Sequence, residues 1–153
     1  MKFKFPVQLN EIQIELETGP CYGPCPVYHL SISGTGEVVF EGRNFVASEG
    51  LQTGQISPEK VKELIAAAFE IGFFEMASNY SCEQTFEILP DGTLDRSEMS
   101  VTDLQLKTFA ITLGLKKKNI RAYVGYPKRL GWFHQLVLEL GGAEEWIGDE
   151  NRY

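Results

Sequence analysis

Two stretches near the N-terminus alternate strictly between apolar and polar side chains. The first covers residues 12–17, and the second, residues 27–33, places Tyr28, Leu30 and Ile32 on one face. A period of two predicts strands with one buried face. The turn-forming segment 34–36 and the apolar run 37–41 follow directly, and this order predicts a hairpin. A fold built on such strands needs other elements to cover their apolar face.

Two amphipathic helices are predicted to supply that cover. Ser57 is a suitable N-cap, Pro58 suits the first helical position, and Gly72 is a natural end. The helix between them carries one apolar stripe, formed by Val61, Leu64, Ile65, Ala68 and Phe69. A second stripe, formed by Leu130, Phe133, Val137 and Leu140, predicts a helix that ends at Gly141-Gly142.

Further strands are predicted in the second half of the chain. They cover residues 84–89, 107–113 and 120–124, with another beginning at 99–101 and a short one earlier, at Phe45–Ala47. We expect a turn at 90–92, a lysine-rich loop at 114–119 and a final turn at Trp146-Ile147. Because the strands come as hairpins, we predict an α+β fold in which an antiparallel β-sheet carries two amphipathic helices on one face.

The length of 153 residues fits one domain. We expect a single α+β domain at 11–148, with loose segments at 1–10 and 149–153. The sequence contains no apolar run of the roughly 20 residues that a membrane-spanning helix needs, and no secretory signal. We therefore expect a cytoplasmic chain without a membrane partner, and a secreted one if a signal has been removed.

The net charge of −7 argues against nucleic acid as the partner. A protein or a small molecule is the alternative. Basic residues nevertheless gather between positions 104 and 138, and they form a candidate anion patch consisting of Lys116, Lys117, Lys118, Arg121, Lys128 and Arg129.

The segment Cys21-Tyr22-Gly23-Pro24-Cys25-Pro26-Val27-Tyr28 is the most distinctive motif. Four interpretations are open for its cysteines: buried structural thiols, a disulfide, a copper or zinc site with His29 or His134, and thiol catalysis. The C-x-x-x-C-P run resembles the copper-binding motif of the SCO copper-chaperone family, which implies a distant histidine ligand. In that family the motif precedes a helix, whereas here a strand is predicted.

The chain also resembles a bacterial domain family of unknown function whose members carry a C-[FY]-G-x-C-P-x-Y motif. Residues 21–28 match this motif, and the hairpin, the helix and the Thr102-Asp103 pair match the order of elements over about residues 11–147. Members of the family often carry secretion or lipoprotein signals, which this sequence lacks. The resemblance implies a single domain and no particular activity.

The sequence lacks the G-x-G-x-x-G, P-loop, G-x-S-x-G and H-E-x-x-H motifs of common enzymes. We therefore predict a small non-enzymatic binding or interaction domain, without a cofactor. A thiol-based redox or metal-handling protein that uses Cys21, Cys25 and His29 is the alternative. The residues of the candidate binding loop are Tyr22, Gly23, Pro26, Tyr28 and Asp103.

Overall fold

The computed structural model describes residues 2–100 and 105–148. The strands of its main sheet are β1 (Ile12–Thr18), β2 (Val27–Ser33), β3 (Glu37–Asn44), β4 (Gly50–Gln55), β5 (Asn79–Tyr80), β8 (Lys107–Leu113) and β9 (Lys116–Ala122). Their order in the sheet is β4-β3-β2-β1-β8-β9-β5. Strands β6 (Cys82–Ile88) and β7 (Leu94–Ser100) form a separate two-stranded ribbon. The helices are α1 (Pro58–Glu70), α2 (Lys128–Gly141) and α3 (Glu144–Ile147), and single turns η1 (Leu9–Glu11) and η2 (Phe73–Glu75) complete the described elements.

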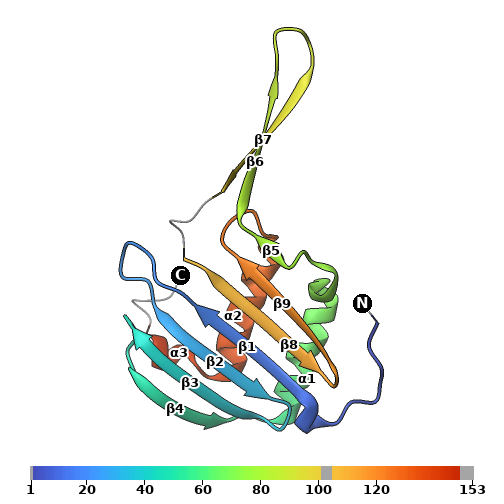
Figure 1. Cartoon of the computed structure of the whole chain (residues 1–153). Coiled ribbons are helices and arrows are strands. Elements are labelled where there is room, and N and C mark those ends of the chain that lie inside the picture. The colour runs from blue at the N-terminus through green and yellow to red at the C-terminus, as the bar shows by residue number, and fades with distance from the viewer. Residues whose placement is uncertain (1, 101–104, 149–153) are drawn as a thin grey trace.

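The helices lie together behind the main sheet in Figure 1. The sheet turns its apolar side chains toward them, as the fully buried Leu30 and Ile32 of β2 and Phe40 of β3 show. The neighbouring residues of each strand remain partly exposed, so the burial alternates along β2 and β3 as the sequence predicted. The α+β class is thereby confirmed.

Helix α1 begins where its capping residues predicted, and both long helices end beside the glycines that the sequence indicated. The Ser57 side chain accepts a hydrogen bond from the backbone N–H of Lys60, and Pro58 occupies the first helical position. Helix α2 ends at Gly142, which adopts the left-handed conformation at a φ of 70°. Just before this end, Gly141 approaches the sheet so closely that a methyl group added to it would lie 3.0 Å from Ile32 Cδ1.

Several strand predictions were wrong. Residues 45–47 form no strand, because β3 ends at Asn44 and Phe45 turns the chain with a φ of 54°. Strand β4 was missed because its sequence, Gly-Leu-Gln-Thr-Gly-Gln, has no apolar alternation at the edge of the sheet. The lysines predicted as the loop 114–119 belong to β9, which pairs with β8.

Three further details differ from the prediction. The ribbon strand expected to begin at 99–101 runs from Leu94 to Ser100 instead. The main sheet is mixed. Strand β5 lies parallel to β9, whereas all the other pairs of neighbouring strands in this sheet are antiparallel. The final turn expected at Trp146-Ile147 is the short helix α3.

The N-terminal segment reaches the helical layer. Phe3 packs edge-on against Phe74, with 4.5 Å between the ring centroids, and it also contacts Phe69 of α1. Within the described residues, none of the helices has both the length and the apolar character needed to cross a lipid bilayer.

Candidate functional site

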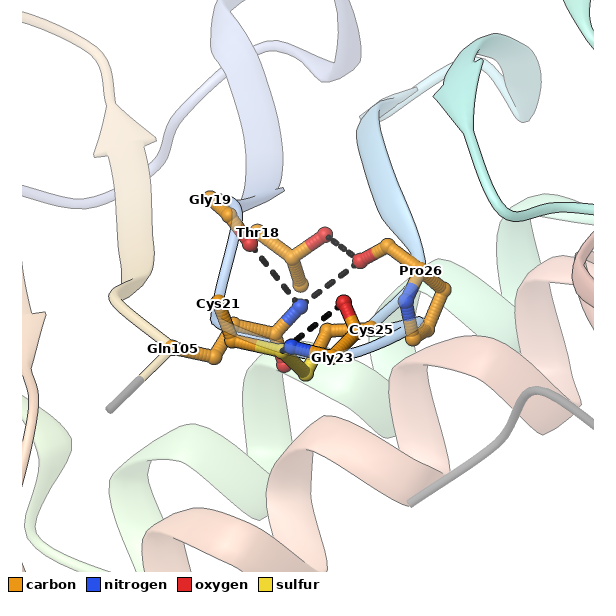
Figure 2. Close-up of a disulfide and its surroundings, with 7 residues drawn as sticks. All are labelled: Thr18, Gly19, Cys21, Gly23, Cys25, Pro26 and Gln105. Atoms are coloured by element: carbon orange, nitrogen blue, oxygen red, sulfur yellow. Dashed lines mark hydrogen bonds between the residues drawn. A yellow bond between two sulfur atoms is a disulfide. The ribbon is translucent and has the colours of Figure 1, made fainter. Parts of the chain in front are cut away.

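The cysteine motif forms the loop between β1 and β2, and its two sulfur atoms are bonded. The Cα atoms of Cys21 and Cys25 lie 5.8 Å apart, within the range that a disulfide spans. The backbone N–H of Gly23 donates to Cys21 Sγ at 3.2 Å inside this small ring (Figure 2). Of the four interpretations of the motif, the disulfide is the one that agrees with this geometry.

The base of the loop is held by hydrogen bonds that do not involve sulfur. Thr18 is buried at the end of β1, and its hydroxyl donates to Pro26 O at 2.8 Å and accepts from the backbone N–H of Tyr28. Gln105 Nε2 reaches in from the other side and donates to Gly19 O and Pro26 O (Figure 2). None of these anchoring bonds uses a sulfur atom.

A buried polar pair lies beneath this base. Tyr28 Oη of β2 and His134 Nε2 of α2 are 2.9 Å apart, and the two residues are 2% and 4% exposed. Burial first, and then the positive charge of Lys107, lower the pKa of His134 to about 3. Burial also raises the pKa of Tyr28 above its ordinary value. Both side chains are therefore neutral near pH 7, and each gives the other a buried hydrogen-bonding partner.

The space beside this pair is small. The pocket has a volume of about 10 Å³, room for about one water molecule, and it is lined by Thr18, Pro26, Tyr28, Gln105, Lys107, His134, Leu138 and Ile147. Burial lowers the pKa of Lys107 at this position. The pair joins β2 to α2 beside a space that holds about one water molecule.

The sequence analysis considered His134 only as a candidate metal ligand and did not predict this pair. A signal was present, since His134 lies four positions after Leu130 and three before Val137, on the apolar stripe of α2. A histidine in that stripe must find a buried partner. The identity of the partner, on a strand 106 positions away in sequence, depends on the tertiary fold.

The structure separates the residues of the predicted binding loop. Tyr22 is 91% exposed at the tip, and Gly23 beside it is also exposed. Pro26 and Tyr28 are buried below the loop. Asp103 lies outside the described residues, together with Thr102.

His29 lies on the opposite face of β2 from Tyr28, and its Nε2 is 3.7 Å from Glu15 Oε1. The disulfide occupies the sulfur atoms of Cys21 and Cys25, so they offer no thiolate while it is closed. Among the described residues, no three histidine, cysteine, aspartate or glutamate side chains gather as a metal site would require.

The residues of the predicted anion patch do not form one surface. Along β9, Lys116 and Lys118 alternate with Lys117 and therefore point to opposite faces of the sheet. Lys118 Nζ donates to Met76 O at 2.6 Å, and Lys117 Nζ lies 3.4 Å from Glu15 Oε2. Arg129 Nε donates to Ile71 O at 2.6 Å, so part of the patch binds groups within the chain.

The ribbon of β6 and β7, residues 82–100, is called the arm below. It projects from the body beyond β5 in Figure 1. In the described part of the chain, its strands pair only with each other. Three large apolar side chains are exposed on it, Phe86 by 62%, Ile88 by 77% and Leu94 by 67%. The sequence predicted strand and turn here, but it gave no indication that the pair stands clear of the sheet.

The profile of a family described as Domain of unknown function (DUF6438) matches residues 12–141. The chain belongs to this family. The matched range includes β1 through α2, and therefore the disulfide loop, the Tyr28–His134 pair and the arm. The comparisons found no match among curated proteins and none among solved structures.

Proposed function

We propose that this member of the DUF6438 family is a protein-binding domain and that the arm is its binding element. The observation that carries the proposal is a cluster of exposed apolar side chains on one face of the arm, which we call its apolar face although Arg96 also lies on it. Phe86 and Ile88 are two positions apart on β6, and Leu94 of β7 lies directly opposite Ile88. The three side chains therefore project from one face of the ribbon. Exposed groups of large apolar side chains mark sites of interaction in folded proteins.

The stability of the arm supports the same function. A two-stranded hairpin without further support is at best marginally stable in water. On the polar face of the arm, Glu87 lies directly opposite Asp95, and like charges at such positions repel. A partner that covers the apolar face and brings a positive charge to this carboxylate pair stabilises the ribbon in both respects.

These features define the chemistry of the partner. We expect a protein with an apolar groove, bordered by lysine or arginine side chains that reach Glu87 and Asp95. A third carboxylate, that of Asp91, lies in the turn of the arm, where Thr93 donates two hydrogen bonds to it. The proposed binding requires no cofactor.

A photo-cross-linking amino acid tests which face of the arm binds. It is placed at position 88 or at position 87, which project from opposite faces of β6, and both proteins are irradiated in their native cells. We expect a discrete cross-linked partner from position 88 and little product from position 87. Equal products from both positions would contradict the proposal.

Affinity measurements with the purified cross-linked partner complete the test. We expect the triple variant Phe86→Ser, Ile88→Ser, Leu94→Ser to lose at least about tenfold in affinity, equivalent to about 1.4 kcal/mol. Leu115→Ser is the matched control, because Leu115 is a fully exposed apolar residue in the turn between β8 and β9. Wild-type affinity in the triple variant would exclude the arm as the binding element.

A reversible thiol–disulfide function is the second candidate. The observation in its favour is that the Cys21–Cys25 bond closes only the loop tip, while Thr18 and Gln105 hold the base. We expect a chain in the cytoplasm, where reductants keep most thiols reduced, so the pair would open and close there. Reduction by dithiothreitol should add two hydrogens to the mass and leave the circular dichroism of the sheet unchanged. Unfolding on reduction, or free thiols at Cys21 and Cys25 in protein purified without reductant, would contradict this function.

A further inference from the structure

The two ends of the main sheet differ in how they resist pairing with other chains. At one end, β9 is paired with β5 only at Arg121 and Ala122, and the part of β9 that β5 leaves unpaired contains Lys116, Lys117 and Lys118. Charged side chains, lysine above all, protect edge strands from unwanted pairing. At the other end, β4 contains neither a charged residue nor a proline. In the described residues no strand other than β3 pairs with β4.

The hydrogen bonds of the hairpin show which backbone groups of β4 are free to pair. Ile56 donates its N–H to Gly36 O, at the position that continues the register of β3 and β4. Hydrogen-bonded pairs alternate with non-bonded pairs along an antiparallel ladder. Gly54 and Gln52 therefore also direct their N–H and C=O groups toward β3, and those of Leu51, Thr53 and Gln55 point away from the sheet.

We propose that β4 pairs antiparallel with β4 of a second copy of this chain and joins the two main sheets. The backbone N–H and C=O groups of Leu51, Thr53 and Gln55 point outward. All of them form hydrogen bonds to the second copy only if the two-fold axis passes between the two Thr53 residues. Leu51 of one copy then lies opposite Gln55 of the other. This interface does not involve the arm, so it is independent of the proposed binding function.

A second copy suits this edge better than an arbitrary strand for two reasons. The six residues of β4 are neutral, so no like charges meet when the strand faces itself, and the central threonine pair is a favourable cross-strand combination. Pairing around a two-fold axis also closes the assembly, because it leaves no further free edge at this end of either sheet. Leu51, which is 67% exposed in the single chain, gains a cross-strand neighbour.

Engineered cysteines test the register directly. They are introduced into a Cys82→Ser background, which removes the third cysteine. Two cysteines at position 53 would have Cα atoms about 5.5 Å apart in the proposed dimer, a separation that a disulfide spans. Cysteines at position 51 would be more than about 13 Å apart. Under mild oxidation we expect Thr53→Cys to form covalent dimers at least about tenfold faster than Leu51→Cys. Equal rates would overturn the proposed pairing.

Sedimentation of the unmodified chain tests the dimer itself. It is measured at concentrations up to roughly 1 mM, because pairing of one short strand buries less surface than a standard interface. Thr53→Pro removes an outward N–H and leaves the bonds to β3 in place, so we expect it to remain monomeric. Thr53→Val keeps that N–H and should dimerise as the wild type does.

Thr53→Lys provides a second variant in case the proline prevents folding. It places two positive charges opposite each other across the two-fold axis, and it should also be monomeric. Circular dichroism verifies that each variant is folded. A wild-type chain that stays monomeric throughout the concentration range would overturn the proposal, and so would a dimer that Thr53→Lys leaves intact.

Discussion

Tyr28 and His134 join the sheet to helix α2 through a single contact of 2.9 Å between Oη and Nε2, under the loop that the Cys21–Cys25 disulfide closes. Each residue is the other's hydrogen-bonding partner, and the space beside them has room for about one water molecule. This arrangement makes the neutral form of the histidine part of the folded state, and it has consequences for how stability depends on pH.

We expect the free energy of unfolding to decrease as the pH falls below about 6.5. Burial, with a smaller effect of Lys107, lowers the pKa of His134 from 6.5 to about 3 in the folded chain. The unfolded chain therefore binds a proton between these values that the folded chain does not bind. The stabilisation is fully present above the unfolded pKa and decreases below it, by up to about 1.4 kcal/mol per pH unit.

Urea unfolding between about pH 5 and pH 7 measures this effect, because fewer carboxylates titrate there. His134→Gln keeps a polar side chain beside Tyr28 and should lose this part of the pH dependence. His29→Gln, which removes the chain's other histidine, is the control. A pH dependence that survives in His134→Gln and disappears in His29→Gln would contradict the assignment.

Removal of the tyrosine hydroxyl should cost more stability than its small volume suggests. Tyr28→Phe leaves His134 Nε2 buried without its partner, and we expect a loss of about 1–3 kcal/mol in the free energy of unfolding. The double variant with His134→Leu, which offers Tyr28 no hydrogen-bonding group, completes a thermodynamic cycle. If the contact stabilises the fold, the loss of stability in the double variant differs from the sum of the two single losses by about 0.5–3 kcal/mol. Additive losses would show that the two residues act independently.

Loss of the disulfide should weaken the domain without unfolding it. In the chain-entropy description, the small ring closed by Cys21 and Cys25 stabilises by about 2 kcal/mol. We expect the double variant Cys21→Ser, Cys25→Ser to lose about this amount in urea unfolding. Because Thr18 and Gln105 still bind Pro26 O, the amide resonances of β1 and β2 should keep their positions. Loss of cooperative unfolding would show that the disulfide is needed for the fold itself.

Much of the fold could be predicted because local periodicity records burial. Val27–Ser33 and Lys107–Leu113 were predicted with their observed boundaries, since each strand has a deeply buried face. Helix α1 followed from Ser57 and Pro58, whose effects are local to the helix N-terminus. Strand β4 could not be found in this way, because it lies at an edge and its side chains remain partly exposed.

The features of the site depend on contacts between distant segments. No local pattern brings His134 to Tyr28, or Gln105 to Gly19 O, because each contact joins residues far apart in the chain. The spacing of Cys21 and Cys25 permitted a disulfide but left three other interpretations open. The exposed face of the arm was equally hidden, since the alternation of Phe86 and Ile88 also fits a strand that packs on a core.

Two glycines of α2 should respond in opposite ways to the same substitution. Gly131 lies within the helix, and a methyl group added there meets no atom within 4 Å. Alanine has the higher helix propensity, so Gly131→Ala should stabilise the chain by about 0.5–1 kcal/mol. A methyl group on Gly141 would lie 3.0 Å from Ile32 Cδ1, and Ile32 is fully buried. Either Ile32 leaves its preferred position or α2 moves off the sheet, so Gly141→Ala should destabilise by about 1–3 kcal/mol. Urea unfolding of both variants checks the contrast, and stabilisation by both would show that α2 is not seated closely on the sheet.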